Sequence, residues 1–518
     1  MLRHHAGVHR QNAAVPRRSP AGAGRPGARA VSLLPTFRPR VQVLSPEFID
    51  RIIDEAYEVN ATLGLQFENP QALSILAEHG QRVDRVKERA WLSRDFVEKA
   101  IASAPRSFKL WNVTGDASIE VGGDNVTYDP GSAAIKVLET DRKTRASTSA
   151  DCVRLSRLVH QLKHIHANST SLVPADVPIE AGDYYRLYMA VQTCDKPIIT
   201  GIFREESFPA TLEILKVVRG SEKALAEKPL AILDACPSSP LRWSVLTSHS
   251  IIEAARHGIP SEIISVPLTG ATGPVTLSGT LVVHTAENLA GIALAQAVRP
   301  GTPVMYGGAP CLMDMRGGQT PFGSIETYLI DCAYAQIGKR FGFPIHSYMG
   351  LSDSKLVDAQ AGYETGLGVV LAALAGVNIV SGVGILDFIT CQSLEKLVID
   401  NEICGMAYRF IEGIQHRHEK MALDLLPEAI EKGHFLGHPT TIKLFREEGT
   451  LPGKAVDRSS AIPGGGGRSD YERAQDIVKE LLAKERFQLP EDKVRELDRL
   501  VLKEAAEFGL EKLPVFPD

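Results

Sequence analysis

Short apolar runs alternate with longer amphipathic stretches between residues 125 and 390. The short runs end at Gly, Pro, Ser, Asn or Asp, which is typical of buried strands, and the longer stretches repeat apolar positions at helical spacing. The pattern predicts eight strands: Val126–Asp129, His164–Asn168, Pro197–Phe203, Ala231–Ala235, Glu262–Pro267, Pro303–Tyr306, Pro344–Tyr348 and Asn378–Ser381.

Helices are predicted between most of these strands, most clearly over Pro209–Val218, Ala286–Ala297, Ser324–Arg340 and Asp358–Ala375. Alternating strands and helices indicate a parallel sheet, and eight such units make a (β/α)₈ TIM barrel. A doubly wound open sheet is the alternative. Its phosphate-binding turn is missing, because Asp387 stands where a dinucleotide fingerprint after Gly382-Val383-Gly384 needs its third glycine. We therefore expect an α/β fold with a TIM barrel.

Helical regions are expected on both sides of this barrel. Ser45-Pro46-Glu47 is a good helix start, with Ser as N-cap and Pro in the first turn. The first residues hold many arginines and no acid, and we interpret them as a disordered leader or a start codon assigned too early. The expected organisation is a leader (1–40), an N-terminal helical cap (41–124), the barrel (125–415) and a C-terminal helical extension (416–518) with a Gly-rich linker at 463–467 before helices at about 469–486 and 490–508.

Composition and charge narrow the class of protein. The chain of 518 residues has 57 Lys plus Arg and 62 Asp plus Glu, a net charge of −5, and this balance argues against nucleic-acid binding. Seven scattered cysteines predict a reduced, cytoplasmic protein. Two uncharged stretches do not predict a membrane span: residues 365–386 are interpreted as a buried helix, turn and strand, and residues 263–286 as strand and loop.

The carboxyl ends of the predicted strands carry a distinctive set of side chains. Active sites of TIM barrels are built at these ends. Aromatic rings and carboxylates dominate the set, which suits a cation such as a quaternary ammonium better than a phosphate. The set comprises Tyr128, Asn168, Phe203, Asp234, Pro267, Tyr306, Asp314, Tyr348, Met349, Ser352 and Asp353.

Other chemistry has little support in the sequence. There is no G-x-S-x-G, H-E-x-x-H or phosphate-binding Gly-Lys-Ser/Thr motif. His164-x-His166 could ligate a metal with Cys236 or Cys311, but no ligand spacing supports this. A structural histidine pair is the better interpretation, and no metal site is predicted.

Four motifs make the chain resemble the trimethylamine methyltransferase superfamily over residues 40 to 510. They are Asp129-Pro130-Gly131-Ser132, Met305-Tyr306-Gly307-Gly308 with Met313-Asp314-Met315-Arg316, Ser352-Asp353-Ser354-Lys355 through Gly362-Tyr363-Glu364, and Gly384-Ile385-Leu386-Asp387 to Asp400-Asn401-Glu402.

The resemblance implies a TIM-barrel enzyme that transfers a methyl group from a methylated amine to the cobalt(I) of a separate corrinoid protein. Founding members of the family carry a pyrrolysine just before the Ser352-Asp353 position, where this chain has standard residues, Tyr348 to Leu351. Relatives without pyrrolysine act on quaternary amines such as glycine betaine. We therefore expect a betaine:corrinoid methyltransferase that has no tightly bound cofactor and receives its corrinoid from a partner protein.

Roles for individual residues follow from this expectation. Tyr128, Phe203, Tyr306 and Tyr348 are expected to form an aromatic cage around the trimethylammonium group, with Met349 beside them. His346 and Arg316 are candidates for the substrate carboxylate, and Asp353 is expected to face the cation or orient its neighbours. His346 and Asp353 are the candidate catalytic residues.

Two other functions stay open at this point. One is a zinc-dependent corrinoid methyltransferase for methanol or a thiol, with zinc at Cys236, Cys311 or the histidines 164 and 166. The other is a non-catalytic betaine sensor or scaffold that binds a corrinoid protein. The expected partners are a small quaternary amine, a corrinoid protein and further copies of the chain, without nucleic acid or membrane.

Overall fold

The computed structural model describes residues 36–131, 133–417, 419–460 and 467–513. The predicted leader, except for residues 36–40, and the predicted linker, except for Gly467, therefore lie outside the described residues. The chain divides into two compact units. The smaller unit includes residues 414–450, and the larger unit spans residues 37–413 and 451–518.

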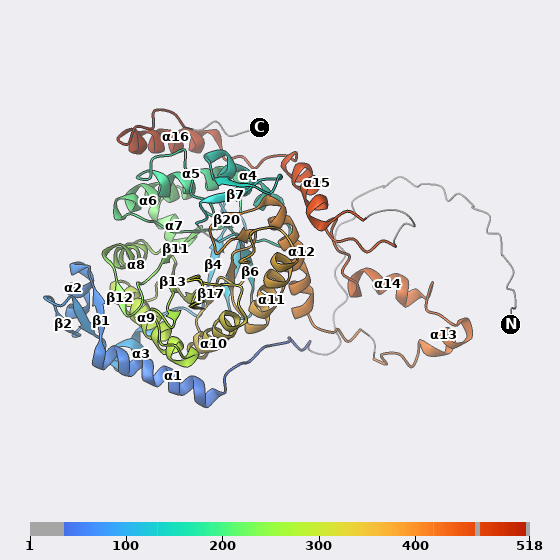
Figure 1. Ribbon diagram of the computed structural model, residues 1–518, viewed down its shortest axis with the longest axis horizontal. Coiled ribbons are helices and arrows are strands. Elements are labelled where there is room, and N and C mark those ends of the chain that lie inside the picture. Colours follow the sequence, from blue (N-terminus) through green and yellow to red (C-terminus); the bar gives the residue numbers. More distant parts are fainter. Residues whose placement is uncertain (1–35, 132, 418, 461–466, 514–518) are drawn as a thin grey trace. The chain divides into compact units, whose positions relative to one another are not determined.

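The larger unit contains an eight-stranded parallel sheet that is nearly closed as a barrel (Figure 1). The strands, in their order around the sheet, are β6 (Thr127–Asp129), β18 (Ile379–Ser381), β17 (Ile345–Ser347), β15 (Val304–Gly308), β13 (Ser261–Ser265), β11 (Ala231–Ala235), β10 (Ile198–Thr200) and β9 (Asn168–Ser169). The backbone N–H of His166 donates to the carbonyl of Tyr128 at 3.2 Å and brings the two end strands together. The predicted TIM barrel is confirmed, and the open sheet is excluded.

All eight strands overlap predicted ones, although β9 shares only Asn168 with the predicted strand His164–Asn168. The helices that follow them in turn are α4 (Ser149–Gln161), α5 (Gly182–Thr193), α6 (Phe208–Arg219) with α7 (Glu222–Glu227), α8 (Val245–His257), α9 (Leu277–Val298), α10 (Ile325–Phe341), α11 (Ala359–Ala375) and α12 (Leu394–Ile411). Local sequence sets several of their ends. Ser324, for example, accepts from the backbone N–H of Thr327 as the N-cap of α10, and Gly342 ends that helix with φ +85°.

The prediction of strand and loop over residues 263–286 was wrong at its end, because α9 already begins at Leu277. Thr276 caps this helix by accepting from the N–H of Gly279, and Thr280 and Thr285 are buried within it. Burial of these side chains outweighs the weak helix propensity of threonine. Among the described residues, α9 alone has the length and apolarity to cross a membrane, but 83% of its most apolar window is buried inside the protein.

Side chains of the barrel strands alternate between the interior and the surrounding helices. Ile199, Ile232, Met305 and Ile379 meet in one apolar cluster inside the barrel. The same cluster includes Phe108 of the antiparallel hairpin formed by β4 (Ser107–Trp111) and β5 (Ser118–Gly122). Apolar side chains therefore fill the barrel at the amino ends of its strands, which leaves the carboxyl ends for polar groups.

The flanking regions are helical as expected but contain more than helices. The N-terminal region has α1 (Pro46–Glu58), α2 (Pro70–Glu78) and α3 (Arg94–Ser103), and also the strands β1 (Leu65–Phe67), β2 (Arg82–Asp84) and β3 (Arg89–Trp91), which the periodicity did not predict. α1 and α3 pack on α9. After the barrel, α15 (Asp470–Leu482) packs on α12, and α16 (Glu491–Ala506) packs on α5 and α6 (Figure 1).

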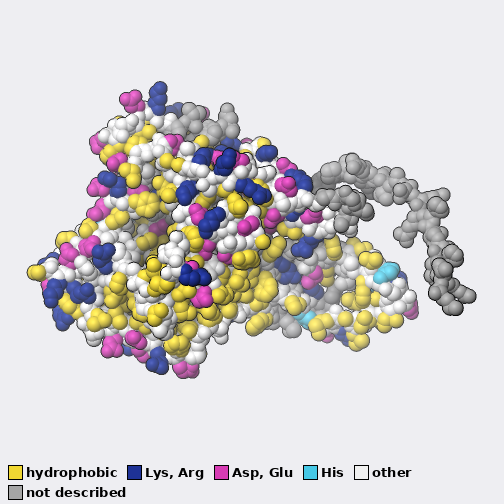
Figure 2. Space-filling model, in the orientation of Figure 1, with side chains coloured by type: hydrophobic (Ala, Val, Ile, Leu, Met, Phe, Trp, Pro, Cys, Tyr) yellow, Lys and Arg dark blue, Asp and Glu magenta, His cyan; other side chains and the backbone are white. Residues whose placement is uncertain are grey.

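The smaller unit contains α13 (Leu426–Lys432) and α14 (Pro439–Glu448). α12 ends at Ile411, and Gly413 follows it with φ +68°. On the face drawn in Figure 2, acidic and basic side chains are interspersed, in keeping with the near-neutral net charge.

Gly291 allows α9 to approach the barrel closely. A Cβ at this position would lie 2.5 Å from Trp243 and 2.8 Å from Ile263. We expect Gly291→Ala to lower the free energy of unfolding by about 1–2 kcal/mol, because overpacking a dense core displaces its neighbours. Thermal unfolding measures this. Gly366→Ala on α11 is the matched control: no atom lies within 4 Å of its added Cβ, so the Tm should stay the same or rise. Equal Tm values for both variants would contradict the prediction.

Candidate active site

A cavity of about 600 Å³ opens at the carboxyl ends of the barrel strands. Its volume lies in the range of small-molecule sites, and its place is that of TIM-barrel active sites. Seven barrel strands contribute residues to its wall, at their carboxyl ends or just after them, together with α5 and the first turns of α8. The wall residues are Ala133, Arg186, Gly201, Ile202, Phe203, Asp234, Cys236, Ser238, Ser244, Leu246, Thr247, Ser250, Ile264, Val266, Ala309, Phe322, Tyr348 and Ile389.

Arg186 supplies the positive charge of the cavity wall. This arginine on α5 is 3% exposed, and its guanidinium donates to the carbonyls of Thr170 at 3.0 Å and Gly201 at 3.3 Å. It also pairs with Asp183 at 3.3 Å. The buried Nε–H has no acceptor among the described residues. Since a buried donor without an acceptor is costly, Arg186 is equipped to bind an anionic group in the cavity.

Three aromatic rings line the wall, and two of them, Phe203 and Tyr348, follow different strands. The backbone N–H of Phe203 donates to Asp183 at 2.8 Å, and the guanidinium of Arg186 lies 4.7 Å from the Phe203 ring centroid. Tyr348 follows β17 and packs edge-on against His346, with the ring centroids 5.1 Å apart. Asp183 thus fixes Phe203 and Arg186 together, on the α5 and β10 side of the cavity.

Asp234 gives the same cavity a negative side, next to Gly201. A Cβ on Gly201 would lie 3.2 Å from Asp234 Oδ2, so a glycine here lets β10 and β11 place the carboxylate beside the cavity. Cys236 is exposed to the cavity, and desolvation inside the barrel together with the nearby Asp234 and Glu262 raises the pKa of its thiol. Cys236 is therefore a protonated thiol at neutral pH.

Below the cavity, polar side chains on the inner faces of neighbouring strands form a layer that we call the acidic layer: Asp129, Asp234, Glu262, His346 and Ser381. Ser381 Oγ donates to Asp129 Oδ2 at 2.7 Å and lies 3.1 Å from His346 Nε2. His346 Nε2 lies 3.7 Å from Glu262 Oε1.

Burial raises the pKa of Asp129 to about 7 and that of Glu262 well above its usual value, and nearby Asp234 adds to both shifts. Burial lowers the pKa of His346 to about 3, so this imidazole is neutral.

Of the four rings expected to cage a cation, the structure brings only Phe203 and Tyr348 to the cavity. Tyr128 and Tyr306 point out of the barrel toward the helices, because strand positions alternate. Tyr128 is fully buried and its hydroxyl donates to the carbonyl of Val369. The Tyr306 hydroxyl lies 2.9 Å from Thr285 Oγ1. Their placement corrects the expected four-ring cage.

The other predicted site residues lie outside the cavity wall. Arg316 has a 92% exposed side chain, paired with Asp314 at 3.0 Å, and Met349 is buried in the core between barrel and helices. His346 belongs to the acidic layer below the cavity. Asp353 accepts from the N–H groups of Phe322 at 3.1 Å and Gly323 at 2.7 Å, so it holds a wall residue in place. Burial raises the pKa of Asp353 to about 6.

The sequence interpretation missed Arg186 and Glu262. A signal for Arg186 exists, because it stands alone as a basic residue in the apolar and aromatic stretch from Tyr184 to Val191. Glu262 is the first residue of the predicted strand Glu262–Pro267, and a charged residue beginning an apolar, buried strand marks a candidate functional position. The candidate residues come from the carboxyl ends of the predicted strands. Arg186 on a helix and Glu262 at the start of a strand are outside that set.

The side chains considered as zinc ligands do not come together. The ring of His166 accepts or donates a hydrogen bond with the Tyr408 hydroxyl at 2.9 Å, and His164 packs beside the same ring. Cys311 is buried in an apolar cluster, and Cys236 is in the cavity. In the described part of the chain, no group of three or more His, Cys, Asp or Glu side chains is arranged to hold a metal.

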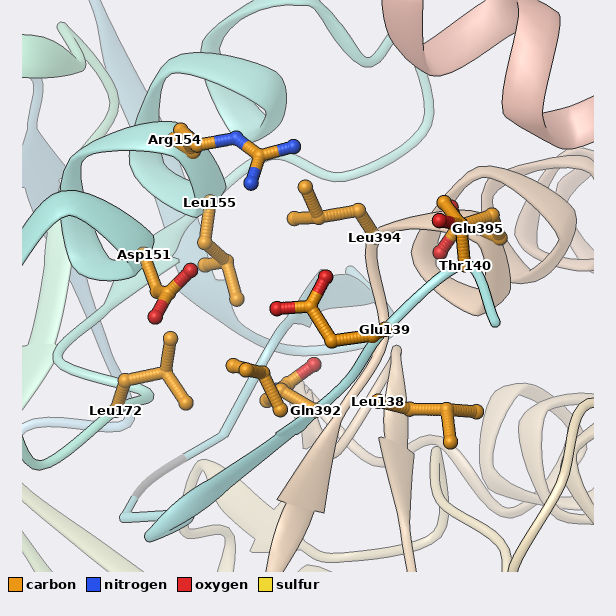
Figure 3. A pocket seen from close by; sticks show the side chains of 11 residues that line it. Leu138, Glu139, Thr140, Asp151, Arg154, Leu155, Leu172, Gln392, Leu394 and Glu395 are labelled. Atoms are coloured by element: carbon orange, nitrogen blue, oxygen red, sulfur yellow. The ribbon is translucent and has the colours of Figure 1, made fainter. Parts of the chain in front are cut away.

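A second pocket near the barrel mouth is much smaller (Figure 3). It lies beside β7 (Lys136–Leu138) and the start of α12, and Glu139 points into it. Its volume of about 40 Å³ has room for a water molecule or two, too little for an organic substrate. Asp151 on its wall caps α4 and pairs with Arg145, at 2.6 Å, which is a structural role.

The loop after β18 holds three consecutive residues in the left-handed region: Asp387, Phe388 and Ile389, with φ between +52° and +64°. Such a conformation is rare for residues with a side chain and persists at functional sites when neighbours enforce it. The N–H of Asp387 donates to the carbonyl of Ser354, and the ammonium of Lys355 lies 3.8 Å from the Phe388 ring centroid. This enforced turn places Ile389 on the cavity wall.

Comparisons with known proteins agree with this architecture. Glycine betaine methyltransferase of Desulfitobacterium hafniense (strain Y51) is 34% identical over 424 residues, which cover 82% of this chain and 88% of the relative. Trimethylamine methyltransferase MttB of Desulfitobacterium hafniense (strain DSM 10664 / DCB-2) is 31% identical over 416 residues, 80% of this chain and 84% of the relative. The crystal structure of the hydroxylamine MtmB complex aligns with a TM-score of 0.50 at 11% identity, over 90% of this chain and 89% of that chain, which supports the fold.

A family match covers almost the whole chain. Residues 13–509 match the trimethylamine methyltransferase (MTTB) family. The matched region includes the barrel, the cavity and the flanking helices. Together with relatives more than 30% identical over most of their length, this match shows that the chain belongs to the trimethylamine methyltransferase (MTTB) family.

Proposed function

We propose that this enzyme transfers a methyl group from a carboxylated quaternary amine, glycine betaine or a similar betaine, to the cobalt(I) of a corrinoid protein. One observation carries the choice of substrate. The cavity bears the buried guanidinium of Arg186 on one side and, on other parts of its wall, three aromatic rings and the carboxylate of Asp234. A betaine has complementary groups, an anion at one end and a fixed cation at the other.

Arg186 is the proposed partner of the substrate carboxylate. A buried guanidinium forms strong charge-assisted hydrogen bonds with a carboxylate. The Nε–H of Arg186 donates to no described residue and is therefore available as a donor to the substrate. Phe203 and Tyr348 are proposed to hold the trimethylammonium group. Contacts with ring faces are worth about 2 kcal/mol each when they are shielded from water. This assignment replaces Arg316, His346, Tyr128 and Tyr306 of the sequence interpretation as substrate contacts.

The chemistry needs orientation more than acid or base. A quaternary nitrogen already carries a positive charge, so the carbon–nitrogen bond breaks with its electron pair remaining on nitrogen. A tertiary amine leaves, and the cobalt(I) lone pair forms the new carbon–cobalt bond. The chain's own contribution is to hold one N-methyl group in line with the incoming cobalt and to exclude water.

The corrinoid is proposed to arrive on a separate protein at the mouth of the barrel. The cavity opens there, and Phe203 on its wall is 55% exposed. The methyl acceptor is thus a second substrate that docks and leaves, while this chain supplies the amine site. We also propose that the chain forms a homo-oligomer, as expected from the sequence. Measuring the molecular mass in solution tests this.

A reconstituted assay tests the function. The purified chain is incubated with cob(I)alamin and, separately, glycine betaine, proline betaine, carnitine, choline or trimethylamine, and methylcobalamin is followed by absorbance. We expect the fastest methylation with one of the carboxylated quaternary amines and none with trimethylamine. Equal rates with trimethylamine would contradict the proposed substrate class. Tight betaine binding without methylcobalamin would instead identify a sensor or scaffold.

A further inference from the structure

The acidic layer concentrates negative groups under the cavity. Asp129 is fully buried at the end of β6, Glu262 is fully buried on β13, and Asp234 lies between Glu262 and the cavity as part of the wall. Asp234 and Asp129 both act on Glu262 electrostatically. Three carboxyl groups therefore share one small region inside the barrel.

The carboxyl groups of this layer outnumber the cations near it. Among the described residues, no Lys or Arg lies within ion-pair distance of Asp129 or Glu262. The neighbouring ring of His346 is neutral, and the thiol of Cys236, which also faces Glu262, is protonated. Arg186 acts on Asp234 and also pairs with Asp183, so this one guanidinium is shared between two carboxylates.

The outer side of β13 contributes no charge to the layer. Glu287 on α9 faces that side, where it accepts hydrogen bonds from Ser265, Ser239 and the N–H of Leu241. The groups that face Glu262 from the packed elements are thus Asp234 and Cys236 of the β11 end, Asp129 of β6 and His346 of β17. None of them is a cation.

Adjacent buried carboxylates that outnumber the nearby cations cannot all be ionised, because each uncompensated buried charge is strongly disfavoured. In the empty cavity, the layer therefore holds at least one proton. A quaternary ammonium changes this balance. It is positive at every pH, it has no N–H to donate, and it can compensate a carboxylate only through its charge.

We propose that the Glu262–Asp234 carboxyl pair is the counter-ion of the substrate's ammonium group, and that binding the cation expels a proton from this pair to the solvent. The proposal rests on the proposed function and deepens it. In the binding step, the protonated carboxyl pair and the quaternary amine form a complex of the ionised pair with the ammonium group. One proton is released to the solvent. When the methyl group leaves, the nitrogen loses its fixed charge and the pair takes a proton back from solvent.

If binding releases one whole proton, the affinity for the cation rises tenfold for each unit of pH. This holds over the pH range in which the empty pair is protonated. The test is isothermal titration calorimetry of the full chain with glycine betaine at pH 6.5, 7.0 and 7.5, in buffers that differ in ionisation enthalpy. We expect the observed heat to depend on the buffer with a slope of about 0.5–1 proton released. Binding whose heat is the same in all buffers would overturn the proposal and leave the proposed function standing.

A neutral analogue separates charge from shape. In 3,3-dimethylbutanoate, carbon replaces the nitrogen of glycine betaine, so the shape and the carboxylate are kept and the cation is lost. We expect it to bind at least tenfold more weakly and to release no proton. Equal proton release by both ligands would overturn the proposal. No binding by any quaternary amine would overturn the proposal together with the proposed function.

Two matched variants locate the proton. Glu262→Gln keeps the size of the side chain and removes its titration, so betaine binding should become weaker, with proton release falling below about 0.1. Glu287→Gln changes another buried glutamate that faces away from the layer, and proton release should stay as in the unchanged chain. Undiminished release in Glu262→Gln would place the proton elsewhere and overturn the assignment.

Discussion

Arg186→Lys is expected to lower kcat/KM for betaine-dependent methylation of cob(I)alamin about 100-fold. Arg186 is buried, already pairs with Asp183, and keeps an Nε–H for the substrate carboxylate. Lysine preserves the charge but loses the planar fork that can bind several acceptors at once. Weakening one partner of a buried, hydrogen-bonded charge pair costs about 3 kcal/mol, and each 1.4 kcal/mol is a factor of ten. Steady-state kinetics with varied glycine betaine measures the loss.

A second ligand distinguishes carboxylate binding from general damage. Tetramethylammonium has the cation but no carboxylate, so Arg186→Lys should change its calorimetric affinity by less than about threefold. Arg340→Lys is the matched control, because Arg340 is exposed and pairs with Asp50 far from the cavity wall. An equal loss of affinity for both ligands would show that Arg186 only supports the fold.

Tyr348→Leu is expected to lower kcat/KM for the same reaction about 30-fold. Tyr348 is on the cavity wall, and leucine fills much of its volume without a negative ring face. Losing one desolvated contact between ring and cation costs about 2 kcal/mol. Affinity for the uncharged analogue 3,3-dimethylbutanoate should change little, since a neutral tert-butyl group gains nothing from the ring quadrupole. Kinetics and calorimetry together measure both effects.

Tyr348→Phe keeps the ring and should retain activity within about fivefold. Tyr363→Leu is a further control, because Tyr363 lies on α11 with 64% of its surface exposed and does not line the cavity. If Tyr348→Phe lost as much activity as Tyr348→Leu, the hydroxyl rather than the ring would be the active feature. Activity unchanged in Tyr348→Leu would remove this ring from the site.

The sequence predicted the barrel well because its signal is local. Buried parallel strands such as Ala231–Ala235 are short, apolar and bounded by turn residues, and helices such as α11 begin at a capping side chain and end at a glycine. The start of α9 was misplaced because the threonines at its beginning are poor helix formers in isolation. Their burial in the core, which the sequence does not display, outweighs that preference.

The candidate site was predicted only in part. Phe203, Asp234 and Tyr348 were expected at strand ends and do line the cavity, whereas Tyr128 and Tyr306 do not. A shift of one position along a strand moves a side chain from the interior to the helix layer. The sequence pattern places strand ends only to within a residue or two, so it cannot decide which face a terminal side chain takes.

By itself, then, the sequence determined the eight strand–helix units, the barrel and the resemblance to an amine methyltransferase, because periodicity, caps and motifs are encoded within short segments. The tertiary structure alone decided which charged groups come together at and below the cavity. Arg186 on α5, Asp234 on β11 and Glu262 on β13 are 28 to 76 residues apart and become neighbours only when the sheet closes into a barrel. Their burial and mutual charge, which set their chemistry, depend on that closure.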